Sequence, residues 1–561
     1  MKKILRLLLL FFAFICLFGC SFSNKPSDNK PIEDDNNVII DDDENNENNQ
    51  TDDEQNGNES TYVEVKVPNI KSATLSDAIK AFDLSYDKSL VEKKKNEVIE
   101  VIKKASSIEE INKAYDDYTL FNDEIFDKYI VSEVLYDADM SNELISSAYI
   151  DLYEMTLEIS TAIEAIKAEI AKSPFAHDFF DGYTDEEIEA IASKDIDDNE
   201  LNSLLVSNKE LLDEFYVADK AERDSILKQF IKNNKRIAEL NGYNSSEYIK
   251  YSDVNDYYRL YSDDEIKNFE TYVNDYVFAL SKEVKALDYR TTDNDELTKV
   301  WKFYKSFENN IDFINSYVKN LGGDFLETYN NLFDSGYYVI SSNPKGNSIA
   351  YQDSGTNVRV VFFGPGYHDT STFIHEFGHY YTSTKGTDHY SYDLCEVHSQ
   401  ADEILLRLYF LLTDPGEASK YYEYLFIDNM LETILDGVMI REFEETIYKD
   451  DVDSLQDVWN EINKKYDYCS SDDWYELIID YNNYYISYAT SAMGSLVLYA
   501  YAKEYGFNEA KEAYFKLCSY DGLGDIEEAF TYAGLPNPLL EETIKDVLSV
   551  IQNEMENSWI N

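Results

Sequence analysis

Hydrophobic and polar positions beyond residue 71 alternate mainly with the period of an α-helix. Apolar residues between positions 226 and 237 follow one helical face, and Gly242 supplies a C-terminal stop. Ser262 and Glu265 stand at the spacing of a capping box, which marks the start of another helix. Segments of this kind fill both halves of the chain, so the pattern predicts a mainly α fold.

One segment departs from this helical period. Residues 337–340 and 358–363 are largely β-branched and aromatic, and turn residues stand between them at 353–355. We therefore expect a small β-sheet here. A Gly-Pro-Gly turn at 364–366 ends the segment, and a helical pattern follows it.

The N-terminus has the pattern of an export signal. Lys2, Lys3 and Arg6 precede an apolar run that is too short for a stable membrane span. The run ends in Leu-Phe-Gly-Cys at positions 17–20, which resembles the lipobox of bacterial lipoproteins. The resemblance implies a signal peptide over residues 1–19 and a lipid on Cys20, which would anchor the protein on the extracytoplasmic face of the cell membrane. The alternative is an ordinary secretory peptide with an incidental cysteine.

Residues 20–70 are rich in Asp, Glu and Asn and contain few apolar side chains. Such a segment cannot bury enough surface to offset the entropy lost on ordering, and its charges repel one another. It is predicted to be a disordered acidic linker.

Composition narrows the range of functions. The 561 residues contain 49 Lys and Arg against 110 Asp and Glu, a formal net charge of −61 that would repel phosphate backbones. Nucleic acid is therefore not expected as a partner. Five cysteines, two of them in the leader, do not form a disulfide framework.

The strongest chemical signal is His-Glu-Phe-Gly-His at positions 375–379. On a helix, residues four apart share a face, so His375 and His379 can converge on one cation with Glu376 beside the open coordination position. Neutral imidazole nitrogens suit zinc. Because the chain has only 6 His, a chance match is expected about 0.01 times. The motif predicts a zinc site.

A catalytic zinc needs a third protein ligand, and five downstream residues are candidates. Glu396 opens a segment, 395–412, with helical apolar spacing, and a ligand on a helix is better preorganised than one on a loop. His389 lies in a loop-like stretch, and His398 points elsewhere on the predicted helix. The full set of candidates is His389, Glu396, His398, Asp402 and Glu403.

Residues 396–403, Glu-Val-His-Ser-Gln-Ala-Asp-Glu, resemble the E-x-x-S-Q-x-x-E segment of the thimet oligopeptidase and oligoendopeptidase F family of zinc metallopeptidases, which are gluzincins. The resemblance implies that Glu396 is the third ligand, with His375 and His379, of one Zn²⁺ per chain. Glu396 follows His379 by 17 residues, a shorter linker than is usual in that family. Further similar pieces occur in order at 237–243, 441–445 and 533–535.

The resemblance extends from about residue 201 to the C-terminus. It implies a large helical zincin-type peptidase with a deep channel and a small β-sheet beside the active-site helix. We accordingly expect an N-terminal helical lobe over 71–200 and a zinc metallopeptidase catalytic domain over 201–561.

A second segment, 481–490, is similar to the family's tyrosine-rich motif that ends in Y-A-T, whose tyrosines donate hydrogen bonds to the developing oxyanion. Tyr488 matches it best. Tyr481, Tyr485 and Tyr488 are spaced by four and three residues, so on one helix their phenols would share a side. With 48 Tyr in the chain, such a stripe could also be ordinary core. Family members carry a His shortly before this motif, whereas this chain has no His after His398.

Together these features predict a zinc-dependent metalloendopeptidase that hydrolyses short oligopeptides outside the cytoplasm. Glu376 would take a proton from the attacking water and pass it to the leaving amine. Glu403 or Gln400 would accept a ring N–H from a ligating histidine. The alternative is a catalytically weakened peptide-binding or adhesin lipoprotein on the same fold. The oligomeric state, cleavage preference and endo- or exo-action do not follow from the sequence.

Overall fold

The structure is a computed structural model. It describes residues 72–73, 85–138, 143–193, 199–287, 294–304, 307–335, 338–341, 349–351, 360–363, 369–385, 391–449, 452–466, 478–479, 481–522 and 526–559. The predicted signal peptide, the lipidation site Cys20 and the acidic linker lie outside these residues. No helix in the described ranges combines the length and the apolar composition that a membrane crossing requires.

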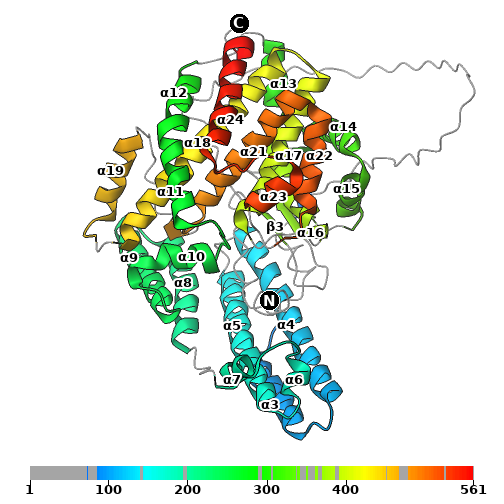
Figure 1. The fold of residues 1–561 in the computed structure, drawn as a ribbon, viewed down its shortest axis with the longest axis vertical. Coiled ribbons are helices and arrows are strands. Elements are labelled where there is room, and N and C mark those ends of the chain that lie inside the picture. The colour runs from blue at the N-terminus through cyan, green and yellow to red at the C-terminus, as the bar shows by residue number, and fades with distance from the viewer. Residues whose placement is uncertain are drawn as a thin grey trace, which may run out of the picture.

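The N-terminal helices form a group at the lower end of the molecule in Figure 1. Leu152, Ile159 and Ile166 of α5 are fully buried at intervals of seven residues, so one face of this helix faces the core, where α3 and α4 pack against it. The elements are α3 (Ser89–Lys104), α4 (Ile108–Ala138), α5 (Glu143–Ala171), α6 (Ala176–Phe179) and α7 (Asp185–Ser193).

Within the described residues, the α-helices α8 to α15 then lead to the strand β2. The predicted stop is confirmed, because α9 ends at Leu240 and Gly242 has a φ of +87°. The capping box is confirmed as well: the Glu265 amide donates to the Ser262 hydroxyl at 3.3 Å, and the Ser262 amide donates to the Glu265 carboxylate at 2.7 Å. The helices are α8 (Asn199–Val217), α9 (Lys220–Leu240), α10 (Tyr248–Asn255), α11 (Asp263–Tyr272), α12 (Phe278–Ala286), α13 (Asn294–Trp301), α14 (Ile311–Leu321) and α15 (Gly323–Ser335).

A four-stranded sheet with the order β1-β2-β4-β3 lies beside α16. Strands β2 and β4 are parallel and confirm the two predicted strands, whereas β3, antiparallel to β4, was not predicted. The predicted turns at 353–355 and 364–366 lie outside the described residues. The strands are β1 (Ser72–Ala73), β2 (Tyr338–Ser341), β3 (Ile349–Tyr351) and β4 (Val360–Phe363).

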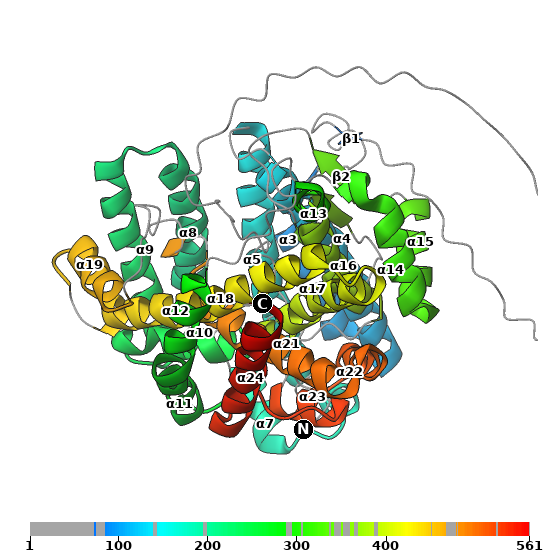
Figure 2. The ribbon, with the colours of Figure 1, turned by 90° about the horizontal axis from the view of Figure 1, so that it is seen from above.

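Long helices build the upper half of the molecule, and α17, α18 and α21 pack against one another in its centre (Figures 1 and 2). Almost every residue of α21 up to Tyr499 is buried, which explains its continuous run of apolar and small side chains. The helices are α16 (Thr370–Lys385), α17 (Tyr392–Thr413), α18 (Glu417–Lys449), α19 (Leu455–Tyr466), α21 (Tyr485–Tyr505), α22 (Phe507–Ser519), α23 (Ile526–Ala533) and α24 (Glu541–Glu554).

The predicted mainly α fold with a small sheet beside the helix of the His-Glu motif is confirmed. The described residues contain two large hydrophobic cores, one formed between Val91 and Ile188 and the other between Leu212 and Trp559. The domain boundaries at residues 70 and 200 and the deep channel stay predictions.

Candidate metal centre

Helix α16 carries the His-Glu motif, and a side chain caps its first turn. The Asp369 carboxylate accepts a hydrogen bond from the Thr372 amide at 2.9 Å. Phe373 and Phe377 are fully buried on the face that packs into the core. His375 and His379, four residues apart, therefore both lie toward α17.

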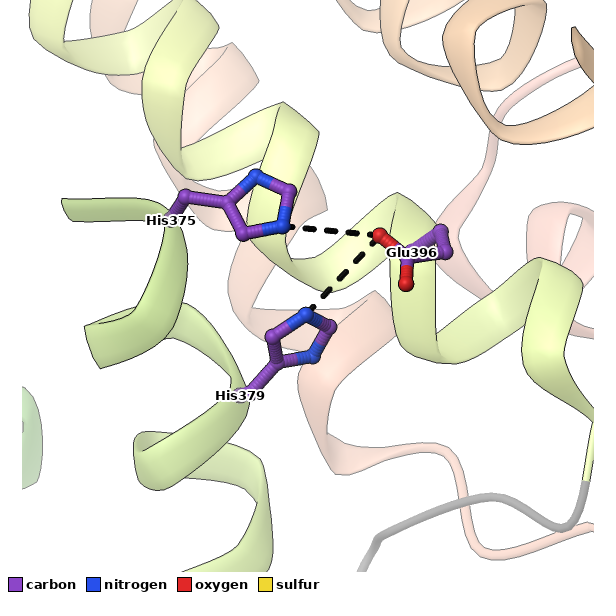
Figure 3. A group of neighbouring side chains, drawn as sticks. All are labelled: His375, His379 and Glu396. Carbon is purple, nitrogen blue, oxygen red and sulfur yellow. Dashed lines mark ion pairs between the residues drawn. The ribbon is translucent and has the colours of Figure 1, made fainter. Parts of the chain in front are cut away.

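Three of the predicted side chains come together. Nε2 of His375 lies 3.5 Å from Oε2 of Glu396, and Nε2 of His379 lies 3.8 Å from the same oxygen. One donor atom from each residue lies within 4.8 Å of the others. Figure 3 shows both imidazoles pointing from one helix toward the carboxylate on the other. The structure thus brings together the two histidines and the distant glutamate.

This donor set fits a catalytic zinc ion. Two imidazole nitrogens and one carboxylate oxygen are a known ligand set of zinc hydrolases, and three ligands leave the fourth tetrahedral position open. Donors about 2.0–2.1 Å from a shared tetrahedral ion would stand roughly 3.3 Å apart. The nitrogen–oxygen distances of 3.5 and 3.8 Å are close to that value.

The two helices that supply the donors cross at Gly378. A Cβ atom at this position would lie 2.9 Å from the Cα of Ser399 and 3.0 Å from the carbonyl oxygen of His398. Only glycine lets α16 approach the backbone of α17 this closely. The close approach brings Glu396 within reach of both histidines.

Glu403 acts on His375 from the side opposite to Glu396. Its Oε1 lies 2.9 Å from Nδ1 of His375, so Glu403, one of the two residues predicted to accept a ring N–H, does contact a histidine of the motif. Its Oε2 accepts from Ser371 at 2.9 Å and lies 3.3 Å from the guanidinium of Arg407. Burial raises the pKa of Glu403, but the hydrogen bond with His375 and the Arg407 charge outweigh it, so the net pKa is lowered.

His379 is held in its neutral form. Burial lowers its pKa to about 4, against the opposing effect of the Glu396 charge and together with that of neighbouring His375. A neutral ring keeps a nitrogen lone pair available at pH 7, as metal binding requires.

Glu376 lies next to His375 on α16 and is fully buried. The other candidates on α17 take different places. His398 is buried, Asp402 accepts from Tyr317, and Gln400 accepts from Ser491 at 3.2 Å. His389 lies outside the described residues.

The tyrosine-rich motif differs from its predicted geometry. Helix α21 begins at Tyr485, so Tyr481 lies in the turn before the helix rather than on it. The rings still form a cluster: that of Tyr488 lies 5.8 Å from Tyr485, and that of Tyr485 lies 5.7 Å from Tyr481. Tyr488 also lies 4.9 Å from the ring of Tyr484.

Tyr484 was missed by the sequence analysis. Its hydroxyl donates a hydrogen bond to Oε1 of Glu396. The residue does not share the four-and-three spacing of the other tyrosines, and only its place in the same tyrosine-rich motif pointed toward it.

Comparison with known proteins shows which fold this is. No protein-family model matches the sequence, and no curated protein matches it. Among solved structures, a protein from Bacillus anthracis str. Ames assigned as an oligoendopeptidase F is 16% identical, with 87% of this chain and 99% of that one covered and a TM-score of 0.62. A second protein assigned as an oligoendopeptidase F gives 14% identity, 87% and 99% coverage and a TM-score of 0.64.

PZ peptidase A, solved with an inhibitor, is 15% identical over 85% of this chain and 99% of that one, with a TM-score of 0.63. All three likenesses cover nearly the whole of the other protein. The chain therefore has the large helical fold of the oligoendopeptidase F peptidases, in agreement with the resemblance of residues 396–403 to that family.

Proposed function

We propose that the protein is a zinc-dependent metallopeptidase that hydrolyses peptide bonds in short oligopeptides. The observation that carries this proposal is the convergence of His375, His379 and Glu396 on one point of a fold shared with oligoendopeptidases. A binding protein on this fold would have no need of a buried carboxylate, Glu376, beside the two histidines.

In the proposed reaction, zinc held by the three donors supplies Lewis acidity, which polarises the scissile carbonyl and makes a water molecule more acidic. Glu376 accepts the proton of the attacking water and delivers it to the leaving amine. Tyr488, with Tyr485 and Tyr481 beside it, donates a hydrogen bond to the oxygen that becomes negative. Glu403 keeps the ring of His375 oriented throughout.

We further propose that the enzyme acts on the extracytoplasmic face of the membrane, held there by lipid on Cys20. The basic start, the short apolar run and the cysteine at its end support this location. Labelled fatty acid should enter the wild type but not a Cys20→Ala variant, and equal labelling of both would contradict the anchor.

The Glu376→Gln variant tests the activity. Loss of the general base is expected to lower the rate of cleavage of quenched-fluorescent peptides by about 10²- to 10⁴-fold, while the protein still binds one zinc. Chelator treatment of the wild type should abolish cleavage, and zinc should restore it.

A zinc-loaded wild type that cleaves no peptide in a diverse library would instead favour a peptide-binding lipoprotein. The absence of any histidine after His398 is the feature of this chain that favours that second function.

A further inference from the structure

The two oxygens of Glu396 have different surroundings. Oε2 faces Nε2 of both histidines and accepts a hydrogen bond from Ser399 at 3.2 Å. Oε1 accepts from the hydroxyl of Tyr484. Because the carboxylate is only 1% exposed, protein groups rather than water determine its orientation.

Tyr484 is itself held on several sides. Its ring lies 5.4 Å from that of Tyr392, at 89°, and 5.8 Å from that of Tyr257. The ring of Tyr488 closes a third side at 4.9 Å. These contacts restrict the rotation of the phenol and fix the position from which its hydroxyl meets Glu396.

The turn that carries Tyr484 is fastened through Asn483, a non-glycine residue with a φ of +60°. Its carbonyl accepts from Arg259 at 2.7 Å, its amide donates to Glu444 at 2.5 Å, and its side chain accepts from Arg441 and donates to Asp253 at 3.0 Å. Every polar group of Asn483 thus contacts the side chain of an arginine or of an acidic residue. Asparagine tolerates this backbone conformation better than most residues.

A buried arginine cluster, defined here as Arg259, Arg441 and Asp253, stands behind the turn. Asp253 accepts from Arg259 at 2.6 Å and from Arg441 at 2.6 and 2.8 Å. Arg259 also donates to Ser487, in the first turn of α21, at 2.7 and 3.1 Å. Charge-assisted bonds in a buried setting are short and rigid, so the cluster locks the start of α21 in place.

We propose that Tyr484 is a positioning residue that holds the Glu396 carboxylate for binding of a divalent cation, and that the buried arginine cluster holds Tyr484 through Asn483. The inference rests on the proposed function, since it takes His375, His379 and Glu396 as the metal ligands. Partners of this kind typically change metal affinity by about 10- to 100-fold when removed.

The Tyr484→Phe variant removes the hydroxyl and keeps the ring. The expected result is zinc binding weakened by about 10- to 100-fold, measured by competition with a chromogenic chelator. Tyr499→Phe is the matched control, because Tyr499, within α21, is buried like Tyr484 and likewise donates to a glutamate, Glu423, at 3.0 Å. That control should leave zinc affinity unchanged even where it lowers thermal stability.

A second variant tests the link through the turn and keeps the backbone conformation. Asn483→Gly should weaken zinc binding in the same direction but less than Tyr484→Phe. Since both changes act on the same carboxylate, the double variant should bind zinc as weakly as Tyr484→Phe alone. The absorption spectrum of the cobalt-substituted protein should change in Tyr484→Phe and not in Tyr499→Phe.

Zinc affinity of Tyr484→Phe within about twofold of wild type would overturn the inference, as would an equal loss in Tyr499→Phe. Full additivity of the two substitutions would overturn the link through Asn483. A wild type that binds no zinc tightly would instead overturn the proposed function, so the two failures are distinguishable.

Discussion

At the scale of single residues, the orientation of the His375 ring depends on Glu403. Nδ1 faces this carboxylate at 2.9 Å, so a neutral ring carries its proton on Nδ1 and keeps the lone pair of Nε2 on the side of Glu396 and His379. Arg407 stabilises the charge of Glu403 and stacks over the ring of Phe426 at 3.8 Å. The carboxylate is thus held in the ionised form that accepts the ring proton.

Replacing Glu403 by Gln tests this arrangement. The amide retains an acceptor but not the charge, so we expect zinc affinity to fall about tenfold, as measured by chelator competition. Glu432→Gln, which neutralises an exposed carboxylate paired with Lys285, should leave the affinity unchanged. Equal affinities for Glu403→Gln and the wild type would contradict a role for Glu403 in orienting His375.

The sequence was sufficient for those residues whose spacing implies their geometry. His375 and His379 are four positions apart, which places both rings on one helix face, and the helical pattern around Glu396 and Glu403 places these two on a second helix. Tyr484 could not be predicted in this way. Its contact with Glu396 depends on the left-handed backbone of Asn483 and on arginines more than 40 residues away along the chain.

At the scale of elements, two helix crossings determine the distances in the site. Gly378 lets α16 approach α17, and Gly437 of α18 stands so close to the start of α21 that a Cβ there would lie 2.6 Å from the Cβ of Ala489. The first crossing brings the histidines to Glu396, and the second brings the turn with Tyr484 to the same carboxylate.

Gly378→Ala should therefore disturb both stability and metal binding. The new methyl group would clash with backbone atoms of α17, which, unlike a side chain, cannot rotate away. We therefore expect a loss of about 1–3 kcal/mol in unfolding free energy and weaker zinc binding. Urea unfolding and chelator competition measure the two effects. Gly416→Ala is the control, since the nearest atom to its Cβ is a flexible carboxylate oxygen at 3.5 Å. Zinc affinity unchanged in Gly378→Ala would show that the crossing does not set the site geometry.

Helix existence could be predicted better than helix boundaries. The capping box at Ser262 and the stop at Gly242 depend only on residues close together in the sequence, and both occur where the sequence predicted them. The start of α21 is set instead by tertiary contacts of Asn483, which is why Tyr481 falls outside the helix. Strand β3 spans three residues, too few to show a periodic pattern.

At the scale of the whole molecule, the buried polar interior makes stability depend on pH. Burial raises the pKa of Glu444 to about 8 and that of both Asp256 and Glu270 to about 7. At a pH between the ordinary carboxyl pKa and these raised values, the three carboxyls stay protonated in the folded protein but lose their protons in the unfolded chain. The stability that these protons contribute is complete below about pH 4.5 and is lost as the pH rises to about 8.

Glu444→Gln should flatten this dependence. The neutral amide resembles the protonated carboxyl and retains an acceptor for the Asn483 amide. We therefore expect the unfolding free energy of the variant to fall less steeply with pH than that of the wild type, by about 1 kcal/mol per pH unit between pH 5 and 8. Urea unfolding at several pH values, in the presence of a chelator, measures the slope. Glu512→Gln, a change at an exposed position of α22, should leave the slope unchanged. If the unfolding free energy of Glu444→Gln fell more steeply with pH than that of the wild type, Glu444 would not be the group whose raised pKa causes the slope.

The hydrogen bond between Tyr484 and Glu396 joins residues 88 positions apart, and this has a consequence for synthesis. Until the chain is present as far as residue 484, it contains both imidazoles and the glutamate but not the phenol that orients the glutamate. The chain therefore acquires its final affinity for the ion only after α21 has emerged and docked, so a fragment that stops before residue 484 should be a poor competitor for metal.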